Sequence, residues 1–232
     1  MKLTVLGWQG PVPGAMGACS GYLLEADTGE AIALDLGSGS LSRLTAIRKP
    51  ESLSAIVLSH LHWDHISDML PLGYLAGANS VPVFAQEGPA FARQALESVG
   101  WRLRAHEDCN IGPFCLRFLP ARHPVAASCV RVECGGKVFV YTGDTNTLPG
   151  LADFAAGADL LLADAGLNEA DWAENKPHLS PRLCASLAAE CGAKKLVLTH
   201  LAAKNDPAEV YAEAAHLRPD AIVAHEGLQM LI

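Results

Sequence analysis

A run of six residues at positions 60–65, HLHWDH, constrains the fold of this chain more than any other feature. It directly follows the apolar stretch Ala55–Ser59, which predicts a buried strand, so we expect the run in the loop at the carboxyl end of that strand. Three histidines and an aspartate are costly to bury unpaired, and protonated histidines would repel one another. Neutral imidazoles and a carboxylate are the donors that zinc and similar ions bind. Because one turn cannot wrap all four donors around one ion, the run predicts two adjacent ions.

Three further polar residues also come directly after apolar stretches that predict strands: His123, Asp144 and His200. A single histidine after a strand is more often a surface or hydrogen-bonded residue than a ligand. Two ions, however, need about four ligands each, so the three residues and the run support one another. The predicted metal ligands are therefore His60, His62, Asp64, His65, His123, Asp144 and His200.

The length and composition predict one large domain spanning residues 1–232. Half of the residues are apolar and 18% are charged, so a sizeable core can form. Aromatic residues are scarce, which favours a core of small and aliphatic side chains such as sheets covered by helices.

Charge and cysteine content limit the partners and the compartment. The 17 basic and 25 acidic residues give a formal net charge of −8. This charge argues against non-specific binding of a nucleic-acid backbone, but not against a small anionic substrate. The seven cysteines form no CxxC pair, and no secretory segment is recognisable, so we expect a protein of the reducing cytoplasm. No apolar run approaches the roughly 20 residues that cross a bilayer, so no membrane partner is expected.

The order of apolar stretches predicts the architecture. Strand-rich stretches followed by alternating strands and helices occur twice, which indicates two packed sheets with helices outside. The expected strands are Lys2–Gly7, Tyr22–Ala26, Ala31–Asp35, Ala55–Ser59, Val81–Ala85, Cys115–Leu119, Cys129–Cys134, Val138–Thr142, Leu160–Ala163, Leu196–Thr199 and Ala221–Ala224. The expected helices are Ser40–Arg48, one from about Ile66, Pro89–Val99, Arg182–Cys191 and Pro207–Leu217.

The HxHxDH run, a later histidine, the aspartate of a GDT sequence and the histidine of a THL sequence, in this order, resemble the metallo-β-lactamase superfamily over nearly the whole chain. The resemblance implies an α+β fold, a four-layer αββα sandwich of two mixed β-sheets flanked by helices, with the metals at one edge. Carried over by motif, one ion would take His60, His62 and His123. The other would take Asp64, His65 and His200, with Asp144 bridging.

The branch of the superfamily follows from finer matches. A β-lactamase-type site carries Cys at the position of Asp144, and glyoxalase II-like enzymes carry a Thr-Pro-Gly-His-Thr type of sequence where residues 121–125 read ARHPV. The His-Leu-Ser sequence at His178, followed by a helix, is similar to the ribonuclease Z-like and phosphodiesterase-like branch. There His178 would donate a proton or hydrogen bond, and Asp164 would orient it. Alternatively, His178 only flanks a helix start, since Ser180 and Pro181 are a good N-cap and first residue.

Asp35 and the loop Gly10–Gly21 each have two possible interpretations. Asp35, before Gly37, resembles an aspartate that holds a ligand imidazole by its other nitrogen, or it only forms a turn. The loop Gly10–Gly21, with Met16, Cys19 and Ser20, lines the pocket, or its glycines serve backbone geometry alone.

The resemblance implies a hydrolase with two divalent metal ions, zinc first and Mn or Fe as alternatives, acting on a small phosphodiester or nucleotide through metal-bound hydroxide. Asp64, His178 and Asp164 are the predicted catalytic residues, with Asp64 and Asp144 orienting the attacking water. A di-iron flavoprotein is disfavoured, because no ligand histidine is replaced by Glu and no flavin domain is appended.

Three other functions stay open. One is ribonuclease Z-like cleavage of RNA 3′ ends, although the basic Gly-rich arm of those enzymes is missing between His123 and His178. Another is hydrolysis of a thioester or lactone, and the third is a metal-binding protein without catalysis. The resemblance also implies a homodimer.

Overall fold

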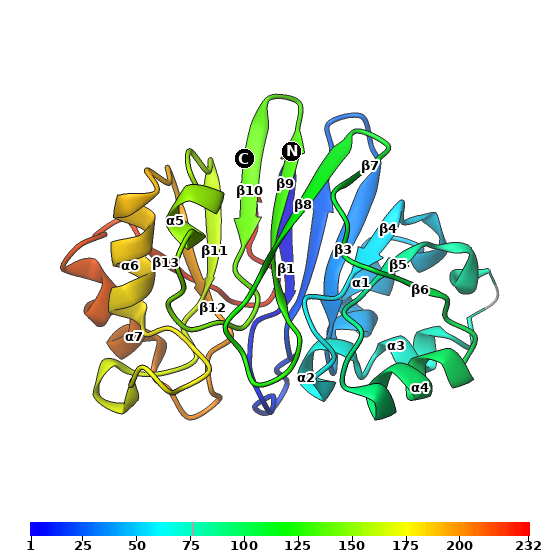
Figure 1. Cartoon of the computed structure of the whole chain (residues 1–232), viewed down its shortest axis with the longest axis horizontal. Coiled ribbons are helices and arrows are strands. Elements are labelled where there is room, and N and C mark those ends of the chain that lie inside the picture. Colours follow the sequence, from blue (N-terminus) through cyan, green and yellow to red (C-terminus); the bar gives the residue numbers. More distant parts are fainter. Residues whose placement is uncertain (76) are drawn as a thin grey trace.

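Two β-sheets pack face to face in the computed structural model, which describes residues 1–75 and 77–232 (Figure 1). The first sheet has the order β14 (Gln229–Leu231), β1 (Lys2–Gly7), β2 (Gly21–Glu25), β3 (Ala31–Leu36), β4 (Ala55–Val57), β5 (Val83–Phe84), β6 (Leu103–Arg104). The second has the order β13 (Ile222–Val223), β12 (Leu196–Thr199), β11 (Leu160–Asp164), β10 (Lys137–Tyr141), β9 (Ser128–Cys134), β8 (Phe114–Pro120), β7 (Cys109–Ile111). Each sheet is antiparallel on one side and parallel on the other, which makes both sheets mixed.

Helices cover the two outer faces, so the predicted αββα sandwich is confirmed (Figure 1). On the first sheet lie α1 (Ser40–Ile47), α3 (Met69–Leu72) and α4 (Ala90–Ser98). On the second lie α5 (Leu151–Phe154), α6 (Pro181–Glu190) and α7 (Pro207–Ala215). Short 3₁₀ turns occur at Pro50–Ser52, Ala78–Ser80 and Glu169–Asp171. None of the described helices is long and apolar enough to span a bilayer.

One predicted helix is wrong in its start. The chain forms a single turn, α2 (Trp63–Ile66), inside the HLHWDH run and a second turn, α3, from Met69, instead of one helix from about Ile66. The backbone N–H of Asp68 donates to the carbonyl of Leu36 in β3 at 3.0 Å. In a continuous helix this N–H would donate to the carbonyl four residues earlier. Because it donates to Leu36 instead, α2 and α3 remain two separate turns.

The core explains why several strands are apolar without interruption. In β3 every residue is buried, because both faces of its sheet are covered. Ile32 and Leu34 pack between the two sheets, whereas Ala31 and Ala33 pack under the helices on the outer face. The first sheet is therefore held from both sides, and its strand ends are rigid supports for the loops that follow.

Strand direction brings several loops to one edge. In the first sheet β1, β3 and β4 run the same way, because β2 is antiparallel to its neighbours and β4 is parallel to β3. In the second sheet β8, β10, β11 and β12 likewise share a direction. Isolated bridges from Gln9 to Leu201 and from His60 to Ala127 tie the loops of the two sheets together. The loops meet at the lower edge of Figure 1, where α2 is labelled.

Candidate metal centre

Three groups of described side chains at this edge offer donor atoms within 4.8 Å of one another, and two of them consist of predicted ligands alone. The remaining group combines Asp144 and His200 with Asp164 and His178. The first group is His60, His62, His123 and Asp144. The second group is Asp64, His65, Asp144 and His200. The structure thus brings together all seven residues predicted as ligands, in the two sets that the family resemblance implies, with Asp144 in both. Their binding of metal stays a prediction.

Local backbone geometry places several of these side chains. His62 precedes α2 in an extended conformation, and the first turn of α2 presents Asp64 and His65. His200 and Asp35 adopt positive φ angles of 60° and 53°, in the left-handed region that costs energy for residues other than glycine. Gly10 lies against the imidazole of His200, and any side chain there would overlap that ring. The backbone of the glycine-containing loop therefore approaches the site closely at Gly10.

The spacing of the donor atoms suits zinc. Tetrahedral zinc with bonds of 2.0–2.1 Å sets neighbouring donor atoms about 3.3 Å apart. In the first group the Nδ1 atom of His62 lies 3.0 Å from Nε2 of His60 and 3.1 Å from Nε2 of His123. In the second group Oδ2 of Asp144 lies 3.3 Å from Nε2 of both His65 and His200. The residues present therefore fit two ions that share one carboxylate.

Four of the five imidazoles are held by the nitrogen that faces away from the ligand group. Nδ1 of His65 donates to Asp35 at 2.8 Å, and Nδ1 of His123 donates to the carbonyl of Pro177 at 3.3 Å. Nδ1 of His60 and of His200 lie 3.1 Å and 3.0 Å from the hydroxyls of Ser59 and Ser20. Such contacts fix the ring orientation and leave Nε2 free for an ion.

Protonation states agree with this chemistry. Burial lowers the pKa of His60 well below its usual value and lowers that of His200 to about 4, so both rings are neutral near pH 7. Burial would raise the pKa of Asp144, but the surrounding imidazoles hold it well below its usual range. Oδ1 of Asp144 and Nε2 of His65 are buried, and neither atom has a hydrogen-bond partner among the described residues. Unpaired buried polar atoms are rare, and a bound cation would satisfy both.

Asp35 anchors the second ligand group from behind. Its fully buried carboxylate accepts hydrogen bonds from the amide and hydroxyl of Ser59 at 2.7 Å and 2.8 Å, from His65 at 2.8 Å, and from the hydroxyl of Tyr141 at 2.9 Å. Of the two interpretations of Asp35, this geometry matches the aspartate that holds a ligand imidazole.

Replacement of Asp35 by Asn is expected to weaken zinc binding by about 10–100-fold, because the amide cannot accept all of these hydrogen bonds and His65 loses its orientation. Competition with a chromogenic chelator measures the affinity. Asp159→Asn is the matched control: Asp159 is also buried and bonded, to Lys194 and to the amide of Val138, but it belongs to neither ligand group. An unchanged zinc affinity in Asp35→Asn would show that Asp35 serves only the fold.

His178 lies beside both ligand groups. Its Nδ1 donates to Oδ2 of Asp164 at 2.8 Å and lies 3.8 Å from Oδ2 of Asp144. Its ring stacks on that of His200 with centroids 5.0 Å apart. Burial would lower the pKa of His178, but the Asp164 carboxylate outweighs burial and raises it to about 9. The pair predicted from the family resemblance is therefore in contact through Nδ1 of His178, and Asp164 does not engage Nε2 of the same ring.

Two residues that support the site, Tyr141 and Asn146, were not predicted from the sequence. Tyr141 lies in β10, where its aromatic side chain is explained by the core, and only the fold shows its hydroxyl on Asp35. Asn146 follows the GDT sequence, and its buried side chain bonds the carbonyls of Ala173 and Lys176 at 2.9 Å and 2.7 Å. A polar residue two positions after a predicted ligand was the signal available for Asn146, but its partners lie about thirty positions away along the chain.

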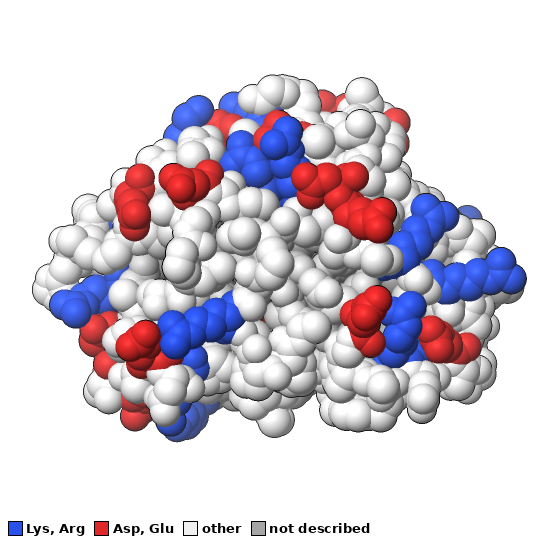
Figure 2. Space-filling view, viewed as in Figure 1, with Lys and Arg blue, Asp and Glu red and all other residues white. Residues whose placement is uncertain are grey.

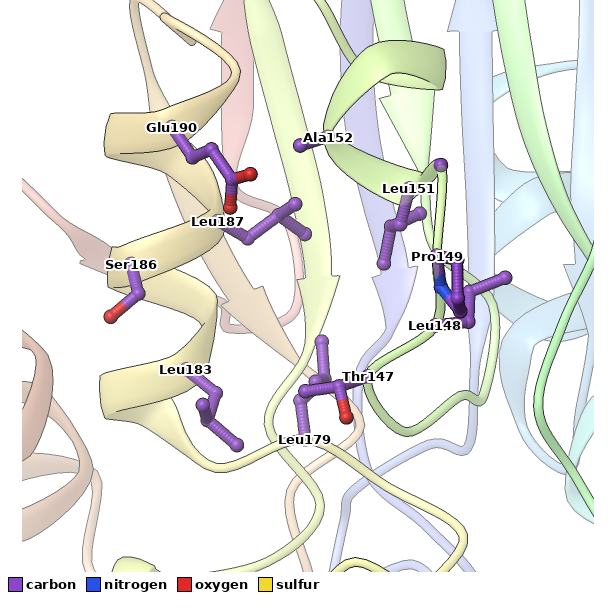
Figure 3. Close-up of a pocket in the computed structure, with 11 residues that line it drawn as sticks. Thr147, Leu148, Pro149, Leu151, Ala152, Leu179, Leu183, Ser186, Leu187 and Glu190 are labelled. Atoms are coloured by element: carbon purple, nitrogen blue, oxygen red, sulfur yellow. The ribbon is translucent and has the colours of Figure 1, made fainter.

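A separate hollow lies between α5 and α6 (Figure 3). This cavity of about 240 Å³ is lined mainly by apolar side chains, with Leu151 of α5 on one side and Leu183 and Leu187 of α6 on the other. None of the predicted ligands lines it. The candidate centre is thus distinct from this apolar hollow, which meets the site only at Thr147 and Leu179, beside Asn146 and His178.

Two mixed sheets between helices, with histidines and aspartates gathered at one edge, define the metallo-β-lactamase fold. The chain belongs to the β-lactamase superfamily, since the model of the β-lactamase superfamily domain matches residues 26–201. The resemblance predicted from the motifs is confirmed.

Individual relatives extend this assignment. A protein of Bacillus subtilis (strain 168) named probable metallo-hydrolase YhfI is 32% identical over 213 residues, which cover 87% of each chain. The crystal structure of YhfI matches with a TM-score of 0.91 at 29% identity over 99% of both chains. Ribonuclease Z of Mycobacterium marinum is 29% identical over 242 residues, covering 86% of each. A diphosphatase from the PhnP family shares the fold, with a TM-score of 0.76 at 20% identity over 100% of this chain and 97% of the other.

Proposed function

We propose that this chain is a dinuclear zinc hydrolase that cleaves a small phosphodiester or nucleotide. The observation that carries the proposal is the 2.8 Å contact of His178 with Asp164 beside two ligand groups that share Asp144. A general acid next to a pair of cations suits the departure of an alkoxide from phosphorus. The relatives named metallo-hydrolase and ribonuclease Z support the same kind of reaction.

The donor set supports zinc as the resident ion. Five of the seven predicted ligands are imidazoles, and the other two are carboxylates. Nitrogen-rich sites with donor spacings of 3.0–3.3 Å suit zinc, while manganese prefers oxygen donors. Manganese and iron stay alternatives, to be separated by metal analysis of the purified protein.

Two divalent ions at this site would acidify a water molecule and polarise an ester oxygen. Around them the chain supplies proton transfer and orientation. Asp64 is mostly buried, with Oδ2 3.5 Å from Nε2 of His65, and can orient the attacking water. Nδ1 of His178 is bonded to Asp164, so Nε2 carries the proton that can pass to the leaving oxygen. Asp164, fully buried, positions this ring and stabilises its charge.

RNA 3′ ends are the second candidate substrate, favoured by the relative named ribonuclease Z. The net charge of −8 makes a long RNA a weaker choice than a small diester. On the face seen in Figure 2, basic and acidic side chains are interspersed, which would not attract an extended phosphate backbone. Acyl esters, a non-catalytic role, the homodimer and the cytoplasmic location stay predictions.

A panel of chromogenic esters tests the proposal on the zinc-loaded protein. We expect turnover of bis-p-nitrophenyl phosphate, with kcat/KM exceeding those for p-nitrophenyl phosphate and p-nitrophenyl butyrate by about 100-fold, since the paired cations would stabilise the charge that develops on the diester oxygens. Faster cleavage of the butyrate would assign an acyl hydrolase instead. Two bound ions without turnover of any ester would favour a metal-binding protein without catalysis.

A further inference from the structure

A second hollow, unlike that of Figure 3, opens directly beside the candidate metal centre. This cavity of about 240 Å³ is lined by two segments of the chain, residues 122–124 and 174–177. The ring of His123 forms part of its wall, while Nε2 of the same ring faces the first ligand group. A group bound in the hollow would therefore lie next to an ester held at the metals.

Two cations border this hollow in an otherwise acidic chain. Arg122 and Lys176 both line it, together with Glu174. The Arg122 guanidinium makes only long contacts among the described residues, 3.4 Å to the carbonyl of Thr147 and 3.7 Å to Glu174. Glu174 is 79% exposed, so this ion pair is screened and easily exchanged for another anion. Within the described part of the chain, Lys176 forms no ion pair shorter than 4.0 Å.

Buried Asn146 forms hydrogen bonds to both chain segments that line the hollow. The side-chain amide of Asn146 donates to the carbonyls of Ala173 and Lys176, and its oxygen accepts from the indole of Trp172 at 3.1 Å. The backbone N–H of Asn146 donates to the carbonyl of Arg122 at 3.1 Å. The Pro177 carbonyl in turn accepts from His123. The width of the hollow is therefore set before a ligand arrives, which reduces the cost of binding.

We propose that this hollow is a subsite for a second phosphate group of the substrate, bound by Arg122 and Lys176 while the diester lies at the metals. The proposal rests on the proposed function and narrows the substrate to phosphodiesters that carry a further phosphate. Guanidinium groups bind phosphate oxygens through two parallel hydrogen bonds, and lysine adds a point charge. Asn146 is the positioning residue that holds the backbone of Arg122 and of Lys176 in place.

Two substrates that release the same chromophore test the subsite: thymidine 5′-(p-nitrophenyl phosphate) and its 3′-phosphorylated form. With the zinc-loaded wild type we expect KM for the phosphorylated substrate to be lower by about tenfold, as one charge-assisted phosphate contact provides. Arg122→Ala and Lys176→Ala are each expected to reduce this preference, and the double variant to bring the KM ratio close to one. Arg102→Ala, which removes an exposed arginine near β6, is the matched control and should keep the preference.

Failure of the subsite and failure of the proposed function give different results in this experiment. Turnover of both substrates with equal KM in the wild type, or a preference that survives in the double variant, overturns the subsite alone. No turnover of either substrate overturns the proposed function and the subsite with it. Calorimetry provides a readout independent of turnover: thymidine 3′,5′-bisphosphate should bind the wild type about tenfold more tightly than thymidine 5′-phosphate, and the double variant should lose that difference.

Discussion

Asp144→Ala is expected to lower the turnover of bis-p-nitrophenyl phosphate by about a thousandfold or more, since removal of several kcal/mol of charge stabilisation by metal ions has that effect on a rate. The zinc content should fall at the same time. The reason is geometric: one oxygen of Asp144 lies 3.3 Å from His65 and from His200, and 3.7 Å from His60, so its loss opens both ligand groups.

Metal analysis and kinetics on the same preparation check this expectation. Asp220→Ala is a control of the same residue type, since Asp220 is exposed and pairs with Arg218 at 2.8 Å, away from the ligand groups. A variant lacking Asp144 that kept both zinc ions and full turnover would show that the carboxylate does not bridge. The two groups would then have to be held by imidazoles and Asp64 alone.

His178→Ala is expected to keep zinc and to lose rate in proportion to how much the leaving group needs a proton. General acid catalysis contributes about 10²–10⁴-fold when the leaving oxygen is basic. We therefore expect about a thousandfold loss on a phenyl phosphodiester and about tenfold on the p-nitrophenyl analogue, whose leaving group departs as an anion. His216→Ala, at the residue that follows α7, is the matched control. Equal losses on the two esters, or none, would assign His178 to the helix start beside Ser180.

The pH profile adds an independent check on the same pair. His178 acts as an acid only while protonated, and Asp164 raises its pKa to about 9, so the wild-type rate should fall as pH rises through that value. Asp164→Asn removes the carboxylate that raises this pKa, so the alkaline fall should move to lower pH. An alkaline limb at the same pH in both proteins would contradict the role of Asp164.

The sequence predicted the architecture well where both faces of a strand are buried. Continuous apolar stretches such as Leu160–Ala163 and Leu196–Thr199 coincide with β11 and β12. The strands β6, β7 and β14 were missed, because each has two or three residues at the edge of a sheet and none of their residues is fully buried. Such short strands are defined by their neighbours rather than by their own periodicity.

In the candidate site, too, the residues within one local motif were predicted more fully than those that depend on tertiary contacts. The HLHWDH run is local, so spacing alone indicated its chemistry. His123 and His200 lie far along the chain, and their positions after predicted strands indicated them as ligands. The division of the seven residues between two ions required the superfamily resemblance. The shared direction of β8 and β12 explains why both histidines reach the same edge. Asp35 was recognised with an alternative interpretation, whereas the roles of Tyr141 and Asn146 depend on tertiary contacts that no local pattern encodes.

Anomalous diffraction from crystals grown with zinc, recorded above and below the zinc absorption edge, tests most directly whether these seven side chains hold a pair of ions. We predict two peaks, one among His60, His62 and His123 and one among Asp64, His65 and His200, with Asp144 in contact with both. Crystals that show no anomalous peak among these seven side chains, or zinc bound only elsewhere, would contradict the dinuclear centre.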